Sequence, residues 1–465
     1  MPQDIGSVHP LRVAIIGAGP AGFYTAERLY KEKTLNVAID MFDRLPTPFG
    51  LVRAGVAPDH QKIKSVTKIF DRVAQNDTFR FFGNVKLGRD ISVEDLRNHY
   101  HQIVYTVGAQ SDRNLPIPGI ELEGSHAATE FVAWYNGHPD YRDYEFDLSQ
   151  ENVAVVGMGN VAIDVARILS RTYNGLKTTD IADHALEALK ESKVKRVYIL
   201  GRRGPAQAAF TPVEAKELLE MTITQTMVLA EEAELDPLSE ASLANADRGT
   251  MRNVEIIRQI AHHPDEHMPK QLFIRFLVSP VELIGDENGR VCALKLVKNE
   301  LYETETGTLR PKPTDEYEEI PVGLVFRSIG YRGVPIEGVP FNDRWGVIAN
   351  NGGRVIDYET EDVVLGEYTA GWIKRGPSGV IGTNKPDAAE TVKLMLEDFA
   401  AGKLLSPSQP SPEAALTLIE QKQPKFVTYA DWQKIDAVEC AKGEEQGRPR
   451  VKFTTVEEML AVVGK

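Results

Sequence analysis

The chain has 465 residues, enough for about three domains of ordinary size or for two large ones. Hydrophobic residues make up 42% of it and charged residues 26%, a globular composition that excludes a disordered or fibrous protein. Its 53 basic and 67 acidic residues give a net charge of −14, which argues against a general nucleic-acid binder but permits a local basic patch.

The two cysteines, Cys292 and Cys440, do not form a CxxC pair. This excludes a disulfide framework, a four-thiolate metal site and a redox-active dithiol. No apolar run approaches the roughly 18 residues of a membrane-spanning helix, and the first predicted strand follows without a basic leader. We therefore expect a cytoplasmic protein.

A nucleotide-binding unit is predicted at the start of the chain. Leu11–Ile16 predicts a buried strand, Ala21–Lys31 a helix and Asn36–Phe42 a second strand. The turn before the helix fits G-x-G-x-x-G and consists of Gly17, Ala18, Gly19, Pro20, Ala21 and Gly22. Such glycines let backbone N–H groups approach a pyrophosphate at the helix N-terminus, although an ordinary strand-to-helix turn is the alternative.

Asp43 follows the second strand of this unit. A carboxylate there can accept hydrogen bonds from ribose hydroxyls and would repel a 2′-phosphate. The first site is therefore predicted to hold FAD or NAD.

A second unit of the same kind begins with the predicted strand Asn152–Val156. Its G-x-G-x-x-A turn consists of Gly157, Met158, Gly159, Asn160, Val161 and Ala162. After the next strand, Lys195–Leu200, Arg202 and Arg203 stand where the first unit has Asp43. Guanidinium groups suit a 2′-phosphate, so this site is predicted to bind NADP; a solvated charge pair is the alternative.

These two units predict an α/β protein with two Rossmann-like, three-layer dinucleotide-binding domains. The polar stretch after Gly108 and the strand Val325–Gly330 are the expected crossings between the domains. We expect an FAD-binding domain made of residues 1–108 and 329–465, with an NADP-binding domain inserted at 109–328. A C-terminal tail follows the Pro- and Ser-rich stretch 406–412.

Two dinucleotide sites without redox cysteines imply that NADPH reduces bound FAD and that the final electron acceptor is another molecule. A flavin accepts a hydride and releases single electrons, so a one-electron protein acceptor fits this arrangement.

Several long motifs, in order along essentially the whole chain, resemble the adrenodoxin-reductase family and in particular its mycobacterial-type NADPH–ferredoxin reductases. The motifs are Gly17–Gly22, Leu45–Arg53, Gly55–His60, Gly157–Asp164, Gly201–Gly204 and Gly371–Pro377. The resemblance implies a glutathione-reductase-like fold in which the NADP domain is inserted in the FAD domain.

The same resemblance implies roles for individual residues. The implied FAD contacts are Ala21, Asp43, Leu51, Leu87, Trp372, Gly379, Val380 and Ile381. The implied NADP contacts are Arg113, Met158, Gly159, Asn160, Val161, Arg202, Arg203, Glu214 and Gly379. Asp43 departs from the family pattern, which has the longer Glu at this position.

His60 and Glu217 correspond to an ion pair beside the flavin in the family. The resemblance implies that they position the nicotinamide, because hydride transfer itself needs no base. From the residues alone, His60 is equally typical of a first helical turn at the surface, and Glu217 of a solvated helix face.

The segment Gly376–Gly382 is rich in glycine and precedes a predicted helix. Its N–H groups and the helix dipole could face the flavin pyrimidine and stabilise the negative charge of reduced flavin, with a plain loop as the alternative.

Family members pass electrons to acidic iron–sulfur ferredoxins, so basic surfaces are candidate docking sites. A helix predicted after Pro58 would bury Ile63, Val66, Ile69 and Val73 and would present a basic stripe of Lys64, Lys68 and Arg72. A second candidate is formed by Arg248, Arg252 and Arg258. Such stripes are also typical of solvated helix faces.

Together these observations predict a ferredoxin–NADP(+) reductase that transfers hydride from NADPH to FAD and then single electrons to a ferredoxin, reversibly. Two alternatives stay open. A non-catalytic NADP(H)-sensing flavoprotein would bind both dinucleotides without turnover, and a flavin-dependent monooxygenase or oxidase would need a substrate cavity and a controlled reaction with oxygen.

Overall fold

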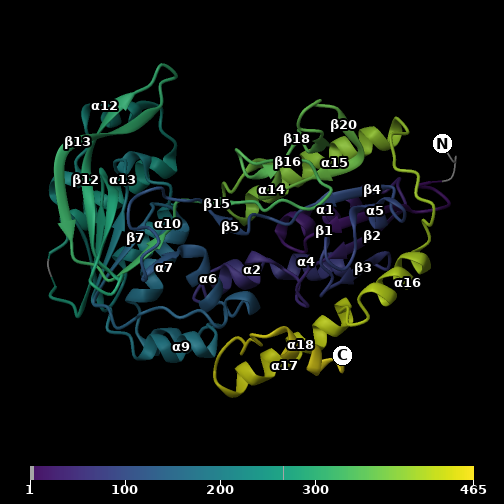
Figure 1. Ribbon diagram of the computed structural model, residues 1–465, viewed down its shortest axis with the longest axis horizontal. Coiled ribbons are helices and arrows are strands. Elements are labelled where there is room, and N and C mark those ends of the chain that lie inside the picture. Colours follow the sequence, from purple (N-terminus) through teal and green to yellow (C-terminus); the bar gives the residue numbers. More distant parts are fainter. Residues whose placement is uncertain (1–4, 265) are drawn as a thin grey trace. The chain divides into compact units, whose positions relative to one another are not determined.

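The computed structural model describes residues 5–264 and 266–465. Its contacts divide the chain into two compact units. Unit 1 consists of Met1–Val56, His60–Ser111 and Tyr331–Lys465, and unit 2 consists of Ala57–Asp59 and Asp112–Gly330. The chain leaves unit 1, builds most of unit 2 and returns, which is the inserted arrangement expected for this fold class (Figure 1).

Unit 1 is built on a seven-stranded sheet in the order β18-β19-β20-β4-β1-β2-β3. Strands β20, β4, β1, β2 and β3 are parallel, and β18 and β19 continue the sheet in antiparallel pairing. Their bounds are β1 Leu11–Ile16, β2 Val37–Phe42, β3 Phe79–Phe82, β4 Gln102–Tyr105, β18 Asn350–Asn351, β19 Arg354–Ile356 and β20 Val363–Thr369. The first two strands agree with the sequence prediction to within one residue.

Both faces of this sheet are buried, as expected for parallel strands that form continuous apolar runs. Alternate residues of β1 enter different clusters: Val13 and Ile15 join one, and Ala14 and Ile16 join the other. Helix α1 (Pro20–Tyr30) packs against α15 (Asn384–Ala400) on the first face. The helices α4 (Thr67–Ala74) and α5 (Val93–Arg97) complete the unit with α2 (Leu51–Ala54), α3 (Gln61–Lys64) and α14 (Trp372–Arg375).

The C-terminal tail adds α16 (Pro412–Lys422), α17 (Tyr429–Glu445) and α18 (Val456–Val462) to unit 1, coloured yellow in Figure 1. Trp432 and Ile435 of α17 and Met459 of α18 are buried in the same cluster as Val13 and Ile15 of β1. The tail therefore contributes to the core of the unit.

Unit 2 contains a fully parallel sheet in the order β6-β14-β7-β8-β10-β9. The strands are β6 Ser125–Ala127, β7 Asn152–Val156, β8 Arg196–Leu200, β9 Thr224–Val228, β10 Lys270–Arg275 and β14 Leu324–Arg327. Residues Val153 and Val155 face a cluster with the helices, while Ala154 and Val156 face a second cluster.

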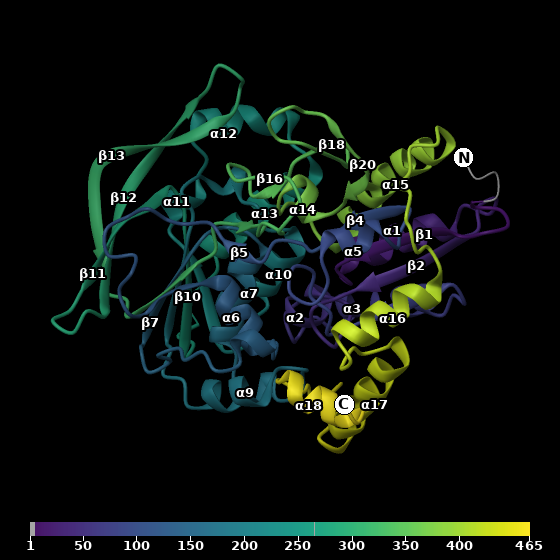
Figure 2. The same ribbon diagram turned by 45° about the vertical axis from the view of Figure 1, so that its right-hand side comes forward.

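The second cluster of unit 2 lies under an antiparallel meander of β11 (Val278–Gly285), β12 (Val291–Glu303) and β13 (Leu309–Ile320), visible at the edge of the unit in Figure 2. The helices of the other layer are α6 Ala128–Tyr135, α7 Asn160–Ser170, α8 Tyr173–Leu176, α9 Asp183–Lys190, α10 Pro212–Leu219, α11 Ala230–Ala233, α12 Pro237–Ser242 and α13 Arg248–Ala261. Meander, sheet and helices form the three layers of a dinucleotide-binding domain.

Four short strands connect these elements: β5 Ser111–Asp112, β15 Tyr331–Arg332, β16 Phe341–Asn342 and β17 Val347–Ile348. Among the residues that the structure describes, no helix is both long and apolar enough to span a bilayer.

The prediction of one continuous helix after Pro58 is wrong. The chain forms α3 and α4 as separate short helices on either side of Ser65 and Val66. Ile63 is 43% exposed and Ile69 36% exposed, whereas Phe70 and Val73 are buried. The break resets the helical phase, so a single 3.6-residue pattern across the whole segment does not describe its faces.

Candidate functional site

The first glycine turn of unit 1 leaves no room for side chains at two positions. Gly17 has a φ of 108°, and a Cβ there would lie 2.6 Å from the carbonyl oxygen of Thr106. A Cβ on Gly22 would collide with the carbonyl oxygen of Gly17. Gly19 is the N-cap of α1, and a Cβ there would lie 4.0 Å from its nearest contact, the Cα of Gly50. The first turn of α1 thus has the shape that a pyrophosphate needs.

Asp43 closes this turn from the end of β2. Its carboxylate accepts hydrogen bonds from the backbone N–H groups of Ala18 at 2.9 Å and Leu45 at 3.0 Å. Burial raises the pKa of Asp43, an effect that these two hydrogen bonds oppose. A carboxylate has about four lone-pair positions, so Asp43 can also accept a hydrogen bond from a hydroxyl donor such as a ribose.

Segments far apart in the sequence meet at the start of α1. Phe49 donates its backbone N–H to Ala18 at 2.7 Å, and the Cα of Gly371 lies so close to Ala21 that a Cβ would reach within 2.6 Å of the Ala21 side chain. The first and last parts of the chain therefore meet at the start of α1, and the binding of FAD by both parts stays a prediction.

The other residues predicted to contact FAD are also in unit 1. Leu51 is 37% exposed at the start of α2 and Val380 is 49% exposed. Leu87 packs against the second cluster of the unit, and the ring of Trp372 lies 5.3 Å from that of Tyr331. Their contacts with a flavin stay predictions.

The second glycine turn, in unit 2, repeats the first. Gly157 has a φ of 141°, and a Cβ there would collide with the carbonyl oxygen of Ser328. Gly159 caps α7 without a side-chain hydrogen bond and has open space in front of its Cα. The N-terminus of α7 thus has space at Gly159 for a ligand that carries phosphate groups.

Arg202 and Arg203 follow β8 in the same unit. Within the described part of the chain, neither guanidinium has a carboxylate oxygen within 4.0 Å. Burial lowers the pKa of Arg203, and the positive charge of Arg202 lowers it further. Two like charges held together without a protein counter-ion favour an anionic ligand such as a 2′-phosphate.

The side chain of Asn160 has an internal partner that sequence reasoning did not foresee. Its Oδ1 accepts a hydrogen bond of 2.8 Å from the backbone N–H of Thr211, the N-cap of α10. The second glycine turn and the helix that carries Glu214 and Glu217 are therefore fixed to each other. The backbone of Asn160 and its Nδ2 stay available to a nucleotide.

A buried arginine, Arg167, also escaped prediction. Its guanidinium lies 3.1 Å from Glu214 and 3.1 Å from Glu217, and it binds Asp59 and Asp164 as well. Arg167 lies on α7, one helical turn after Asp164. The i, i+3 spacing of these two residues is the feature of the sequence that indicates their ion pair.

His60 belongs to unit 1 and Glu217 to unit 2, so their pairing stays a prediction. The same holds for a contact of Gly379 with NADP. Arg113 is exposed in unit 2, with its side chain 3.6 Å from the position that a Cβ on Gly330 would take.

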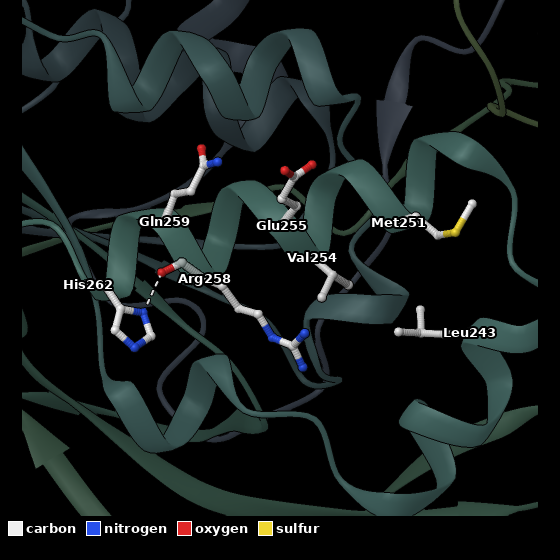
Figure 3. A pocket seen from close by; sticks show the side chains of 7 residues that line it. All are labelled: Leu243, Met251, Val254, Glu255, Arg258, Gln259 and His262. Atoms are coloured by element: carbon white, nitrogen blue, oxygen red, sulfur yellow. Dashed lines mark hydrogen bonds between the residues drawn. The ribbon is translucent and has the colours of Figure 1, made fainter.

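The predicted basic stripe is wrong at one residue, because Lys64 is buried. Lys68 and Arg72 are exposed on α4. In the second candidate surface, Arg252 pairs with Glu255 and Arg258 with Glu240, while Arg248 is exposed. Arg258 lines a hollow of about 520 Å³ on α13 together with Leu243, Met251 and Val254. Figure 3 shows how these side chains lie.

Comparisons with known proteins agree with this geometry. Residues 11–198 match the model of the pyridine nucleotide-disulphide oxidoreductase family. The NADPH-ferredoxin reductase FprA of Mycobacterium tuberculosis is 44% identical over 463 residues, which cover 98% of this chain and 99% of that protein. The mitochondrial NADPH:adrenodoxin oxidoreductase of Arabidopsis thaliana is 42% identical and covers 98% of this chain and 96% of its own.

A solved structure of Mycobacterium tuberculosis FprA in complex with NADPH superimposes with a TM-score of 0.91 at 43% identity, covering 98% of this chain and 99% of that one. Unlike the disulphide enzymes after which the matched family is named, the chain has two free cysteines, Cys292 in unit 2 and Cys440 in unit 1.

Proposed function

Because this chain belongs to the family of NADPH-dependent ferredoxin and adrenodoxin reductases, we propose that it is a ferredoxin–NADP(+) reductase. It is an FAD- and NADP(H)-dependent oxidoreductase. When bound, FAD accepts a hydride from NADPH and passes electrons singly to an iron–sulfur protein.

The protein's own residues bind and orient the two cofactors. In unit 1 the turn Gly17–Gly22 holds the pyrophosphate of FAD and Asp43 accepts hydrogen bonds from its ribose. In unit 2 the turn Met158–Val161 holds the pyrophosphate of NADP(H), and Arg202 and Arg203 bind its 2′-phosphate. His60 and Glu217 orient the nicotinamide.

The single observation that carries this proposal is the contrast between the two glycine turns. One is completed by the carboxylate of Asp43 and the other by two arginines without a carboxylate partner in the described chain. A carboxylate rejects a 2′-phosphate and two guanidiniums attract it. One chain thus offers one site for FAD and one for NADP(H).

The test is an anaerobic visible spectrum of the FAD-loaded protein, titrated with NADPH or NADH and then mixed with an oxidised ferredoxin. Bleaching by NADPH at much lower concentration than by NADH, followed by reoxidation by ferredoxin, is the expected result. A flavin spectrum indifferent to NADPH contradicts a reductase and favours the NADP(H)-sensing alternative.

The double variant Arg202→Gln/Arg203→Gln tests the second site. Two charge-assisted hydrogen bonds are lost, so the half-saturating NADPH concentration should rise about 10- to 100-fold while that of NADH changes little. Lys312→Gln is the matched control, because Lys312 is an exposed cation of unit 2 that pairs with Glu300 on the meander. Unchanged NADPH selectivity in the double variant would remove the assignment of these arginines.

For the partner, we propose an acidic ferredoxin that docks through Lys68 and Arg72 of α4. These cations are exposed, and the described chain places no carboxylate within 4.0 Å of either. Arg252 and Arg258 of α13 are already paired with glutamates, so their attraction for an acidic partner is weaker. A cytoplasmic location is also part of this proposal, and cell fractionation tests it.

A further inference from the structure

The loop between α14 and α15 is held by the side chain of Arg375 together with Thr383 and Asn384, a set of residues that we call the brace. The proposed function does not explain this brace. The loop runs from Gly376 to Thr383 and includes Gly379, Val380 and Ile381, the residues assigned to the flavin. Arg375, the last residue of α14, has a side chain only 21% exposed, because it folds back under this loop.

Arg375 satisfies most of its five N–H donors on this one loop. Its Nη1 donates to the carbonyl oxygen of Ser378 at 2.6 Å and to that of Gly376 at 3.3 Å. Its Nη2 donates to Thr383 Oγ1 at 3.2 Å and to Asn384 Oδ1 at 3.1 Å. The buried carboxylate of Asp387 lies 3.5 Å from Nε and holds the guanidinium from behind.

Two of these acceptors, Thr383 and Asn384, in turn donate hydrogen bonds to other carbonyl groups of the loop. Thr383 accepts from Arg375 and donates its hydroxyl to the carbonyl oxygen of Val380 at 2.6 Å. Asn384 accepts from Arg375 through Oδ1 and donates through Nδ2 to the carbonyl oxygen of Ile381 at 3.0 Å. Arg375 thus helps to orient four carbonyl groups, two directly and two through a neighbouring side chain. Each of these carbonyls also accepts from a second donor: Gly376 from the backbone N–H of Ser378, Ser378 from Trp372 Nε1, Val380 from the backbone N–H of Thr383 and Ile381 from that of Asn384.

The direction of these carbonyls decides where the amides point. In a trans peptide the C=O group and the N–H group of the next residue point in opposite directions. Carbonyls of Ser378, Val380 and Ile381 that face the brace therefore turn the N–H groups of Gly379, Ile381 and Gly382 away from it. Two of these three N–H groups belong to glycines, Gly379 with a φ of 77° and Gly382 with open space before its Cα, so neither residue has a side chain of its own to cover its N–H group.

We infer that Arg375 is a positioning residue that holds three backbone N–H donors of this loop toward the pyrimidine side of the flavin. Those donors stabilise the negative charge that the pyrimidine side carries after reduction, and so they raise the reduction potential of the flavin. The inference rests on the proposed function and on the flavin contact of Gly379–Ile381 that the family resemblance implies.

The test uses Arg375→Lys and Arg375→Met in the full-length, FAD-loaded protein. Lysine keeps the charge but has one nitrogen, which cannot reach Ser378, Thr383 and Asn384 together. Lys385→Met is the matched control: it removes an exposed cation at the start of α15, whose nearest carboxylate is Glu27 at 3.9 Å.

Two quantities are measured: the Kd for FAD by flavin fluorescence, and the ratio of oxidised to reduced flavin in equilibrium with a reference dye. In Arg375→Met both should rise about tenfold, which for the two-electron couple is about 30 mV toward more negative potential. Arg375→Lys should recover less than half of either change, and Lys385→Met should match the parent.

A lysine variant that equals the parent in both quantities overturns the inference, as does a methionine variant without a shift or a control that shifts equally. If Arg375→Met does not fold, Arg375→Lys decides alone. The parent is first titrated with NADPH: a parent that is not bleached contradicts the proposed function, whereas a normal parent with unchanged variants contradicts only the role of Arg375.

Discussion

His101 lies directly before β4, and its ring continues the pairing of that strand with β1. The backbone N–H of Arg12 donates to His101 Nδ1 at 3.0 Å, while the backbone N–H of His101 donates to the carbonyl oxygen of Arg12 at 3.0 Å. The first of these bonds requires an unprotonated Nδ1. Burial, and then the charge of Arg12, lowers the pKa of His101 to about 4.

This shift predicts a loss of stability in acid. Between the ordinary pKa of about 6.5 and the folded value of about 4, the unfolded chain binds the proton and the folded chain does not. The free energy of unfolding should therefore fall as the pH decreases from 6.5 to 4, by roughly 1–2 kcal/mol from this residue after allowance for solvent screening.

The variant His101→Asn tests this effect, since its Oδ1 can take the place of Nδ1 and does not titrate. Urea unfolding of parent and variant at pH 7 and pH 4.5 gives the comparison. The variant should lose less stability than the parent over this interval, and equal losses would show that His101 is not the titrating group.

At the scale of elements, the break between α3 and α4 determines which charges reach the surface. Lys64 closes α3 and is buried, whereas Lys68 and Arg72 stand one turn apart on α4 and are exposed. Of the three cations in the predicted stripe, therefore, only the two on α4 reach the surface.

Charge reversal on α4 should slow electron transfer to ferredoxin without affecting hydride transfer. In Lys68→Glu/Arg72→Glu the second-order rate with ferredoxin should fall about tenfold or more at low salt, and the difference should shrink as salt screens the charges. Reduction of a small dye by NADPH should be unchanged.

Arg252→Glu/Arg258→Glu on α13 is the companion variant, because it reverses the same number of charges on the rival surface. An equal or larger effect on ferredoxin there, with none on α4, would move the docking site to unit 2.

At the scale of the whole chain, the C-terminal tail binds α2, the helix that begins with Leu51, a predicted FAD contact. Glu439 of α17 is fully buried and accepts two hydrogen bonds from Arg53 of α2, 386 residues away in sequence. Arg450 and the backbone N–H of Phe453 complete its partners. Burial raises the pKa of Glu439, but the charges of Arg53 and Arg450 outweigh it and keep the pKa below its usual value.

Removing this carboxylate should lower the free energy of unfolding of unit 1. Glu439→Gln removes the buried counter-ion of Arg53 and leaves Arg450 with Asp436 alone, which costs about 3 kcal/mol. Urea unfolding followed by the release of FAD should shift to lower urea than in the parent. Glu457→Gln, an exposed glutamate of α18, is the control, and a variant that releases FAD like this control would show that the tail does not support the flavin site.

The sequence by itself determined the fold class and the two glycine turns. Strands such as Leu11–Ile16 and Asn152–Val156 are continuous apolar runs, and the glycines at 17, 22 and 157 are the residues that their crowded turns accept. These features depend on residues close in sequence, where periodicity and backbone sterics are sufficient.

Only the tertiary structure decided which charged side chains are buried and what they hold. The burial of Lys64, the pairing of Arg53 with Glu439, the bond from Thr211 to Asn160 and the brace of Arg375 under its loop leave no periodic trace in the sequence. Each depends on partners brought together by packing, and a charged residue has the same local pattern whether it faces water or a buried counter-ion.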